Sequence, residues 1–167
     1  MVIRRGLVLL LAGWMAVADG APRTLDWVEL LPEGARAAYD PAPPAPLHDY
    51  LTGEAAGLAA QQSMDFTVNK ALDGAEVKLP GFIVPLELDE TGKVTEFFLV
   101  PFFGACIHVP PPPPNQLVLV SMEQGLSLDS MYTAYSITGR MSIVRTATSL
   151  GTSAYALAGT AAEEYRF

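Results

Sequence analysis

The C-terminal half of the chain alternates apolar and polar residues with the period of two that is typical of β-strands. In the stretch "TAYSITGRMSIV", residues 133–144, the odd positions from Tyr135 to Ile143 are apolar or glycine, and the even positions between them are polar. Residues 153–167 repeat the alternation. Both stretches are therefore predicted to be antiparallel strands with one buried face.

Three further strands are predicted upstream of these two. Residues 75–89 form a long apolar run that is expected to bend at Pro80-Gly81, because neither residue suits a flat strand interior. The sequence Glu90-Thr91-Gly92 is a turn signal that joins this strand to residues 93–103 in a hairpin. The middle of the second strand is almost wholly apolar, which is typical of burial on both faces. Residues 115–122 are the third of these strands.

Five strands with glycines in their interiors favour a small barrel, because glycine permits the sharp bending that closure requires. The fold class is therefore mainly β, with some helix at the N-terminus (α+β). We predict a five-stranded, closed or nearly closed barrel that resembles the oligonucleotide-binding (OB) fold. An open sandwich is the alternative.

The N-terminal part of the chain has a different character. Residues 24–34, "TLDWVELLPEG", have the apolar spacing of a short helix or turn that ends at Pro32. Residues 39–50 are rich in proline and favour an extended strap over the domain surface, and residues 49–64 favour an alanine-rich helix. We therefore assign residues 22–65 to a helical, proline-rich strap and residues 66–167 to the barrel domain.

The first 18 residues have the pattern of a secretory signal peptide. Arg4 and Arg5 precede the apolar run 6–18, which ends on the small-residue pattern Ala16-Val17-Ala18. This run is shorter than the 20 or so apolar residues that a membrane-spanning helix needs. Cleavage is expected near residues 18–21, and no cysteine stands there to receive a lipid. The predicted location is the periplasm.

Charge narrows the classes of partner. The chain has 10 basic and 18 acidic residues, a net charge of −8. Removal of the signal peptide takes away Arg4 and Arg5 and no acidic residue. A protein this acidic repels nucleic acid and anionic membrane surfaces. It remains compatible with a metal ion or with a basic partner.

The chain contains one cysteine, Cys106, in the stretch "GACIHVPPPPPNQ". A single cysteine cannot form an internal disulfide in an oxidising compartment, so its thiol must be protected, bound to a ligand or reactive. The most frequent fate of a lone cysteine is burial as a small apolar residue.

His108 lies two positions after Cys106, and five prolines, residues 110–114, follow. If the chain is extended there, side chains at i and i+2 point the same way, so thiolate and imidazole face one ion. These ligands suit zinc or copper(I), and Glu87 is the candidate for a third ligand. The alternative is purely structural: a hydrogen bond from His108 that closes the loop, and a solvated charge at Glu87.

Neighbouring polar residues have supporting roles in this hypothesis. Asn115 and Gln116 are predicted to orient the loop through their side-chain amides, and His48 is a more distant ligand option. The prolines brace the loop as a stiff rod. Alternatively, the rod is itself a ligand for an aromatic groove on another protein. Thiol catalysis is disfavoured, because no third group is apparent that would orient a Cys-His pair and no second cysteine is present.

Four blocks of the sequence resemble a known family. They are "LDWVELLPE", "VKLPGFIVPLE", "EFFLVPFFGACIHVPPPPPNQ" and "AYALAGTAAEEY". Together they are similar to the bacterial secreted proteins called domain of unknown function 3299. The resemblance implies export to the periplasm and, for some members, a gene setting beside efflux-type transporter subunits under zinc starvation. It implies no reaction.

From these observations we expect a periplasmic, non-enzymatic accessory protein that binds zinc or a similar metal through Cys106, His108 and Glu87. The expected partner is the periplasmic face of an ABC-type transporter or another envelope protein. The alternative is a protein interaction module that uses the proline loop.

Overall fold

Five long strands form where the alternation of apolar and polar residues, the apolar runs and the turn signals predict them. The computed structural model describes residues 21–40, 62–107 and 109–166. The strands are β2 (Glu76–Leu88), β3 (Val94–Val100), β4 (Val118–Leu126), β5 (Ala134–Ala147) and β6 (Thr152–Glu164). A two-residue strand that the pattern does not indicate, β1 (Arg23–Thr24), pairs in parallel with β2.

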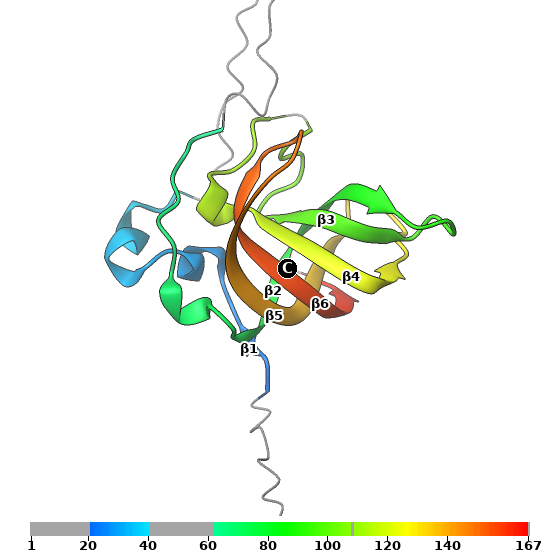
Figure 1. Ribbon diagram of the computed structural model, residues 1–167, viewed down its shortest axis with the longest axis horizontal. Helices are drawn as coiled ribbons and strands as arrows, with labels where there is room; N and C mark the ends of the chain where they lie inside the picture. The colour runs from blue at the N-terminus through cyan, green and yellow to red at the C-terminus, as the bar shows by residue number, and fades with distance from the viewer. Residues whose placement is uncertain (1–20, 41–61, 108, 167) are drawn as a thin grey trace, which may run out of the picture.

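The five long strands close into a barrel (Figure 1). Their order is β2-β3-β4-β6-β5, and β5 pairs back to β2. Strands β4 and β6 are parallel, and the other pairs are antiparallel. The prediction of a small OB-like barrel is confirmed, and the sandwich alternative is not adopted.

Closure depends on the bend in β2. Residues 76–82 of this strand pair with β5, whereas residues 82–88 pair with β3. Pro80 and Gly81 lie at the end of the first half, as the sequence predicts for the bend. Gly81 has no room for a side chain, because a Cβ there would lie 2.7 Å from the carbonyl oxygen of Val100. One bent strand can therefore bond to two neighbours that a flat strand would not reach.

Strand β3 is buried on both faces, as its continuous apolar run predicts. Phe97 and Leu99 point into the barrel and join the main core with residues of all the other long strands. Phe98 and Val100 point outward into a second apolar cluster. The second cluster must be covered by something outside the barrel.

That cover is the loop between β3 and β4. Ala105 and Cys106 of this loop pack with Phe98, Val100 and Leu117 on the outer face of the sheet. The strands equivalent to β3 and β4 carry the ligand face of many OB barrels. In this protein, part of that face is occupied by the chain's own loop.

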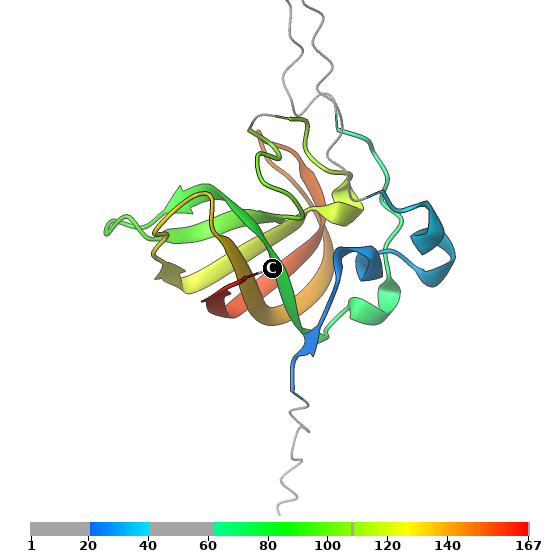
Figure 2. The same cartoon turned by 180° about the vertical axis from the view of Figure 1, so that it is seen from behind.

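The N-terminal segment packs on one side of the barrel as short 3-10 helices (Figures 1 and 2). They are η1 (Trp27–Leu30), η2 (Glu33–Ala38) and η4 (Lys70–Leu72); another 3-10 helix, η5 (Pro114–Gln116), precedes β4. The Trp27 indole donates a 2.7 Å hydrogen bond to the Pro80 carbonyl. The Tyr155 hydroxyl donates a 2.6 Å hydrogen bond to the Leu30 carbonyl. These two bonds fix the segment to the bend of β2 and to β6.

The short helix predicted within residues 24–34 corresponds to η1. The predicted helix 49–64 lies mostly outside the described residues, and its described end, Gln62–Met64, is not helical. The signal peptide and His48 also lie outside the described residues. Within the described ranges, no helix has the length and apolar character needed to cross a membrane.

Candidate functional site

The loop that carries Cys106 is a tight turn, not an extended chain. Gly104 has φ +87°, and Cys106 has φ +64°, in the left-handed region that residues other than glycine seldom adopt. The backbone N–H groups of Ile107 and Val109 both lie 3.3 Å from the Gly104 carbonyl oxygen, to which they donate. Cys106 therefore does not have the extended backbone on which the Cys106–His108 hypothesis relies. A left-handed residue at the start of the pair turns the backbone away from the strand geometry that this hypothesis needs.

Cys106 is protected by burial. Its side chain is 3% exposed and packs among the apolar residues of the second cluster. Burial away from water disfavours the thiolate and raises the pKa of Cys106 to about 12. At neutral pH the group is a neutral thiol, which is a poor nucleophile and a poor metal ligand.

The three proposed zinc ligands are not assembled by the described residues. His108 lies outside them. Glu87 is exposed near the turn between β2 and β3, whereas Cys106 is buried between its own loop and the outer face of the sheet. Within residues 21–40, 62–107 and 109–166, no three His, Cys, Asp or Glu side chains are close enough to hold a metal ion. The zinc hypothesis stays a prediction.

The proline segment is a buried brace. Pro110, Pro111, Pro112 and Pro114 are buried, and Pro113 is half-buried. Pro111 packs beside Gly151, whose added Cβ would lie 3.2 Å from the proline ring. A rod buried in this way cannot offer its ring edges to an aromatic groove on another protein without leaving the barrel, so the exposed-rod form of the interaction hypothesis is not supported.

Gln62 ties the proline segment to β6. Its Nε2 donates hydrogen bonds to the carbonyl oxygens of Pro112 at 2.7 Å and Thr152 at 2.8 Å. Its Oε1 accepts a 2.8 Å bond from the Thr152 N–H. Proline has no N–H, so its carbonyl is the only backbone group through which such a segment can be held. A single buried glutamine supplies that bond.

Asn115 and Gln116 lie at the end of the same loop and are 1% and 5% exposed. The Asn115 Nδ2 donates a 3.0 Å bond to the Thr67 carbonyl, and the Gln116 Nε2 donates a 2.9 Å bond to the Asn115 carbonyl. The Asn115 bond connects the loop to the segment before η4, whereas the Gln116 bond lies within the loop. Asn115 therefore contributes to the position of the loop, and Gln116 adds a local bond at its end.

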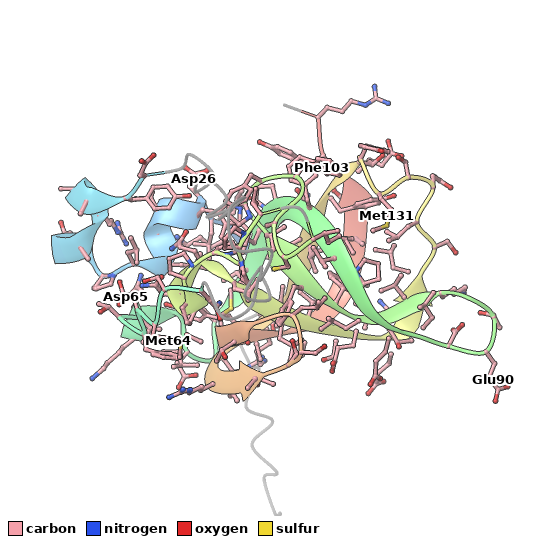
Figure 3. The ribbon with its side chains drawn as sticks, turned by 90° about the horizontal axis from the view of Figure 1, so that it is seen from above. Asp26, Met64, Asp65, Glu90, Phe103 and Met131 are labelled. Atoms are coloured by element: carbon pink, nitrogen blue, oxygen red, sulfur yellow. The ribbon has the colours of Figure 1, made fainter. Side chains whose placement is uncertain are left out.

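Large apolar side chains are exposed on the β3–β4 loop and on the neighbouring β4–β5 loop. We define the aromatic surface as Phe103 and Ile107 of the β3–β4 loop with Met131 and Tyr132 of the β4–β5 loop. Their exposed fractions are 45%, 46%, 41% and 76%. The rings of Phe103 and Tyr132 stack with centroids 4.8 Å apart, and Figure 3 shows Phe103 and Met131 at the same end of the barrel.

A groove runs beneath the aromatic surface. Its volume is about 260 Å³, and it is lined by these four residues with Gly104 and three residues of β2: Phe82, Ile83 and Val84. Phe82 packs edge-on against Phe103 with the ring centroids 6.0 Å apart. Tyr132 supplies the only polar side chain among the described lining residues. The groove therefore suits an apolar group.

The sequence profile of the family described as a protein of unknown function (DUF3299) matches residues 27–164. This chain belongs to the DUF3299 family. A crystal structure of a DUF3299 protein from Pseudomonas aeruginosa PAO1 is 43% identical in sequence and superimposes with a TM-score of 0.74. The match covers 89% of this chain and 99% of that one. A search of curated proteins found no match. Membership confirms the resemblance recognised from the four sequence blocks.

Sequence reasoning missed both Gln62 and the aromatic surface in this DUF3299 chain. Gln62 stands in a stretch that the alanine-rich pattern assigns to a helix. Phe103 was assigned to the end of a strand, although Gly104 directly after it signals a turn in which the ring is left outside. Tyr132 follows the turn-rich stretch "SLDS". An aromatic residue in such a loop is a sequence signal for a binding surface.

Proposed function

We propose that this DUF3299 protein is a non-enzymatic accessory protein of the bacterial periplasm that binds a partner protein of the cell envelope through the aromatic surface. The observation that carries the proposal is the gathering of four large, exposed apolar side chains from two loops over an apolar groove. Soluble proteins seldom expose such side chains contiguously unless the patch binds something. Aromatic residues and methionine are also enriched in protein interfaces.

The expected partner is a protein segment that offers an apolar side chain to the groove. The aromatic rings supply contact area with little loss of side-chain freedom, since Phe103 is already held between Phe82 and Tyr132. The periplasmic location rests on the signal-peptide pattern of residues 1–18. A transporter subunit that faces the periplasm is the partner that the family resemblance favours.

The proposal is tested with a photo-crosslinking amino acid at position 132, introduced into the protein in its native host. We expect one discrete adduct with an envelope protein, and we expect Ile107→Asp to abolish it, because a carboxylate in the groove opposes an apolar ligand. The matched control carries the crosslinker at Glu90, which is exposed on the turn between β2 and β3 (Figure 3). Equal adducts at both positions, or none at position 132, contradict the proposal. An adduct of two copies of this chain identifies self-association in place of an envelope partner.

Zinc binding is the competing hypothesis and predicts a different result. Metal coordination by Cys106 and His108 requires the buried thiol to lose its proton, so the β3–β4 loop must open when zinc binds. Zinc titration of the purified, reduced protein, followed by calorimetry, tests this hypothesis, with Cys106→Ser as the control. Affinity that depends on Cys106 supports the metal role, and affinity that is absent or unchanged in the variant removes it.

A further inference from the structure

A second cavity lies on the other flank of the β3–β4 loop and shares no lining residue with the groove under the aromatic surface. Its volume is about 270 Å³. It is enclosed by the N-terminal 3-10 segment, the residues before η4, and both ends of the loop. The lining residues are Leu31, Ala38, Tyr39, Asp40, Asp65, Pro101, Phe102, Pro112, Pro113, Asn115 and Gln116.

Most of the wall is apolar and part of it is aromatic. Leu31, Pro101 and Pro112 supply aliphatic surface, and Tyr39 and Phe102 contribute rings. Cavities of this kind, with a few polar groups among apolar walls, are the usual form of small-molecule sites. Aromatic rings also attract cations through the negative charge of their faces.

The charged groups of the cavity are all negative. Asp40 and Asp65 line it, and no lysine, arginine or histidine is present among its described lining residues. Asp65 accepts a 2.9 Å hydrogen bond from the Thr67 N–H. Hydrogen bonds from the Thr67 backbone and side chain, together with one from the Asn115 amide, lower the pKa of Asp65. The carboxylate is therefore ionised and held in place at the cavity wall.

Asp65 has no ion-pair partner within the described residues. Gln116, another lining residue, has a buried Oε1 that accepts no hydrogen bond in that part of the chain. Asp65 and Gln116 thus offer acceptor oxygens to the cavity, and its described lining residues carry no positive charge. A ligand that carries donors and a positive charge would match them.

We propose that this cavity binds a small organic cation: an ammonium, amidinium or guanidinium group on a compact apolar or aromatic body. The carboxylates of Asp40 and Asp65 would meet the cationic group, and the rings of Tyr39 and Phe102 would meet the body. A bare divalent metal ion fits less well, because only two carboxylates line the cavity and the rest of the wall is largely apolar. Anionic ligands are disfavoured by the same two charges.

The test compares three ligands of nearly equal shape: benzamidine, which is cationic, benzamide, which is neutral, and benzoate, which is anionic. Binding is followed by chemical shifts of backbone amides in the isotope-labelled full protein. We expect benzamidine to bind with a Kd on the order of 0.1 to 1 mM, a usual range for so small a ligand. Benzamide should bind at least roughly tenfold more weakly than benzamidine, and benzoate should not bind. The shifted amides should belong to residues 31–40 other than Pro32, to residues 65–67, and to Asn115 and Gln116, since the lining prolines have no amide proton.

Variants identify the charge responsible. Asp65→Asn keeps an oxygen that accepts the Thr67 N–H and removes the charge, so we expect a roughly tenfold to hundredfold loss of benzamidine affinity without loss of fold. Glu90→Gln makes the same change in net charge at the opposite end of the molecule and should leave affinity unchanged (Figure 3). Tyr39→Leu, which removes the ring and keeps apolar volume, should weaken binding severalfold.

Three results would overturn the proposal. The first is equal binding of benzamidine and benzamide, since charge would then play no part. The second is equal affinity in the Asp65→Asn and Glu90→Gln variants. The third is that magnesium or zinc chloride alone, at micromolar concentration, shifts the same amides and prevents benzamidine binding, which would indicate a metal site.

Discussion

At the scale of single residues, two buried groups should make the protein less stable at alkaline pH. Burial raises the pKa of the Cys106 thiol to about 12. Burial also raises the pKa of the Tyr155 phenol to about 12, although the hydrogen bond from the Asn69 N–H partly opposes the shift. In an unfolded chain these groups titrate near pH 8.5 and pH 10. Between those values and pH 12 the folded protein keeps protons that the unfolded chain has lost.

We therefore expect the free energy of unfolding to fall as the pH rises above about 9. The slope for one group is about 1.4 kcal/mol per pH unit, and above pH 10 the contribution of Tyr155 adds to it. Urea denaturation at pH 7, 9, 10 and 11 measures the effect. Cys106→Ala should flatten the decline between pH 9 and 10, whereas Tyr155→Phe should retain it there and flatten only the part above pH 10. Superimposable pH curves for the parent and Cys106→Ala would show that the thiol is not buried in solution.

At the scale of elements, the β3–β4 loop is held by a few side chains that are distant in sequence. Gln62 bonds to Pro112 and Thr152, which lie 50 and 90 residues away along the chain. Asn115 bonds to Thr67, which is 48 residues away. Proline offers only its carbonyl for a backbone hydrogen bond, so these long-range bonds help to determine where the loop lies. The same loop covers Cys106 and presents Phe103.

Gln62→Ala removes three hydrogen bonds and should lower the free energy of unfolding by about 2 to 4 kcal/mol, since the Pro112 carbonyl and the Thr152 backbone lose their partner. The matched control is Gln124→Ala, which removes one exposed bond to the Thr160 carbonyl and should change stability by less than about 0.5 kcal/mol. Urea denaturation gives both values.

The Gln62 variant should also speed the reaction of Cys106 with a thiol reagent in the folded protein, because the loop that covers the thiol is released. If the variant loses stability but its thiol reacts at the parent rate, the Gln62 hydrogen bonds do not contribute to the protection of Cys106.

At the scale of the whole molecule, the barrel depends on close backbone approach where β5 meets β6. Gly139 lies against the backbone of Ala158 and Gly159, so an added Cβ would overlap the Ala158 carbonyl and lie 2.9 Å from the Gly159 Cα. Neither backbone group can move away without opening the β5–β6 ladder, which has a register shift at this point. Gly34 is different, because a Cβ there meets nothing within 4 Å.

Gly139→Ala should therefore lower stability by about 3 kcal/mol or more. Gly34→Ala should be neutral or stabilising by about 0.5 kcal/mol, since it reduces only the freedom of the unfolded chain. Thermal and urea denaturation of the two variants provide the comparison. A small, equal effect of both substitutions would mean that the barrel tolerates separation of β5 and β6.

The overall charge predicts that this OB-like barrel does not bind nucleic acid. The net charge is −8, and the second apolar cluster shows that the chain's own loop covers part of the outer face of β3 and β4. A fluorescent single-stranded oligonucleotide should show no change in anisotropy with about 100 µM protein at about 50 mM salt, where binding to phosphate is favoured. Saturable binding under these conditions would contradict the charge argument.

The sequence by itself determined the local features of this protein. Period-two alternation located β5 and β6, and apolar runs bounded by turn signals located the other long strands. Pro80-Gly81 marked the bend in β2, and Glu90-Thr91-Gly92 marked the hairpin turn, because side-chain direction and backbone freedom are properties of neighbouring residues. The continuous apolar run of β3 likewise predicted burial on two faces. The acidic charge and the single thiol also follow from composition alone.

Only the tertiary structure decided what the loop does. Cys106 was predicted on extended chain beside its partners, but the turn at Gly104 and the apolar face of β3 bury it, because burial depends on what packs from elsewhere in the chain. The aromatic surface joins Phe103 to Tyr132, and the second cavity joins Tyr39 to Asp65 and Asn115. No local pattern contains such pairs. They form because barrel closure and the Gln62 bonds bring distant segments together, and long-range packing, unlike strand periodicity, has no repeat along the sequence.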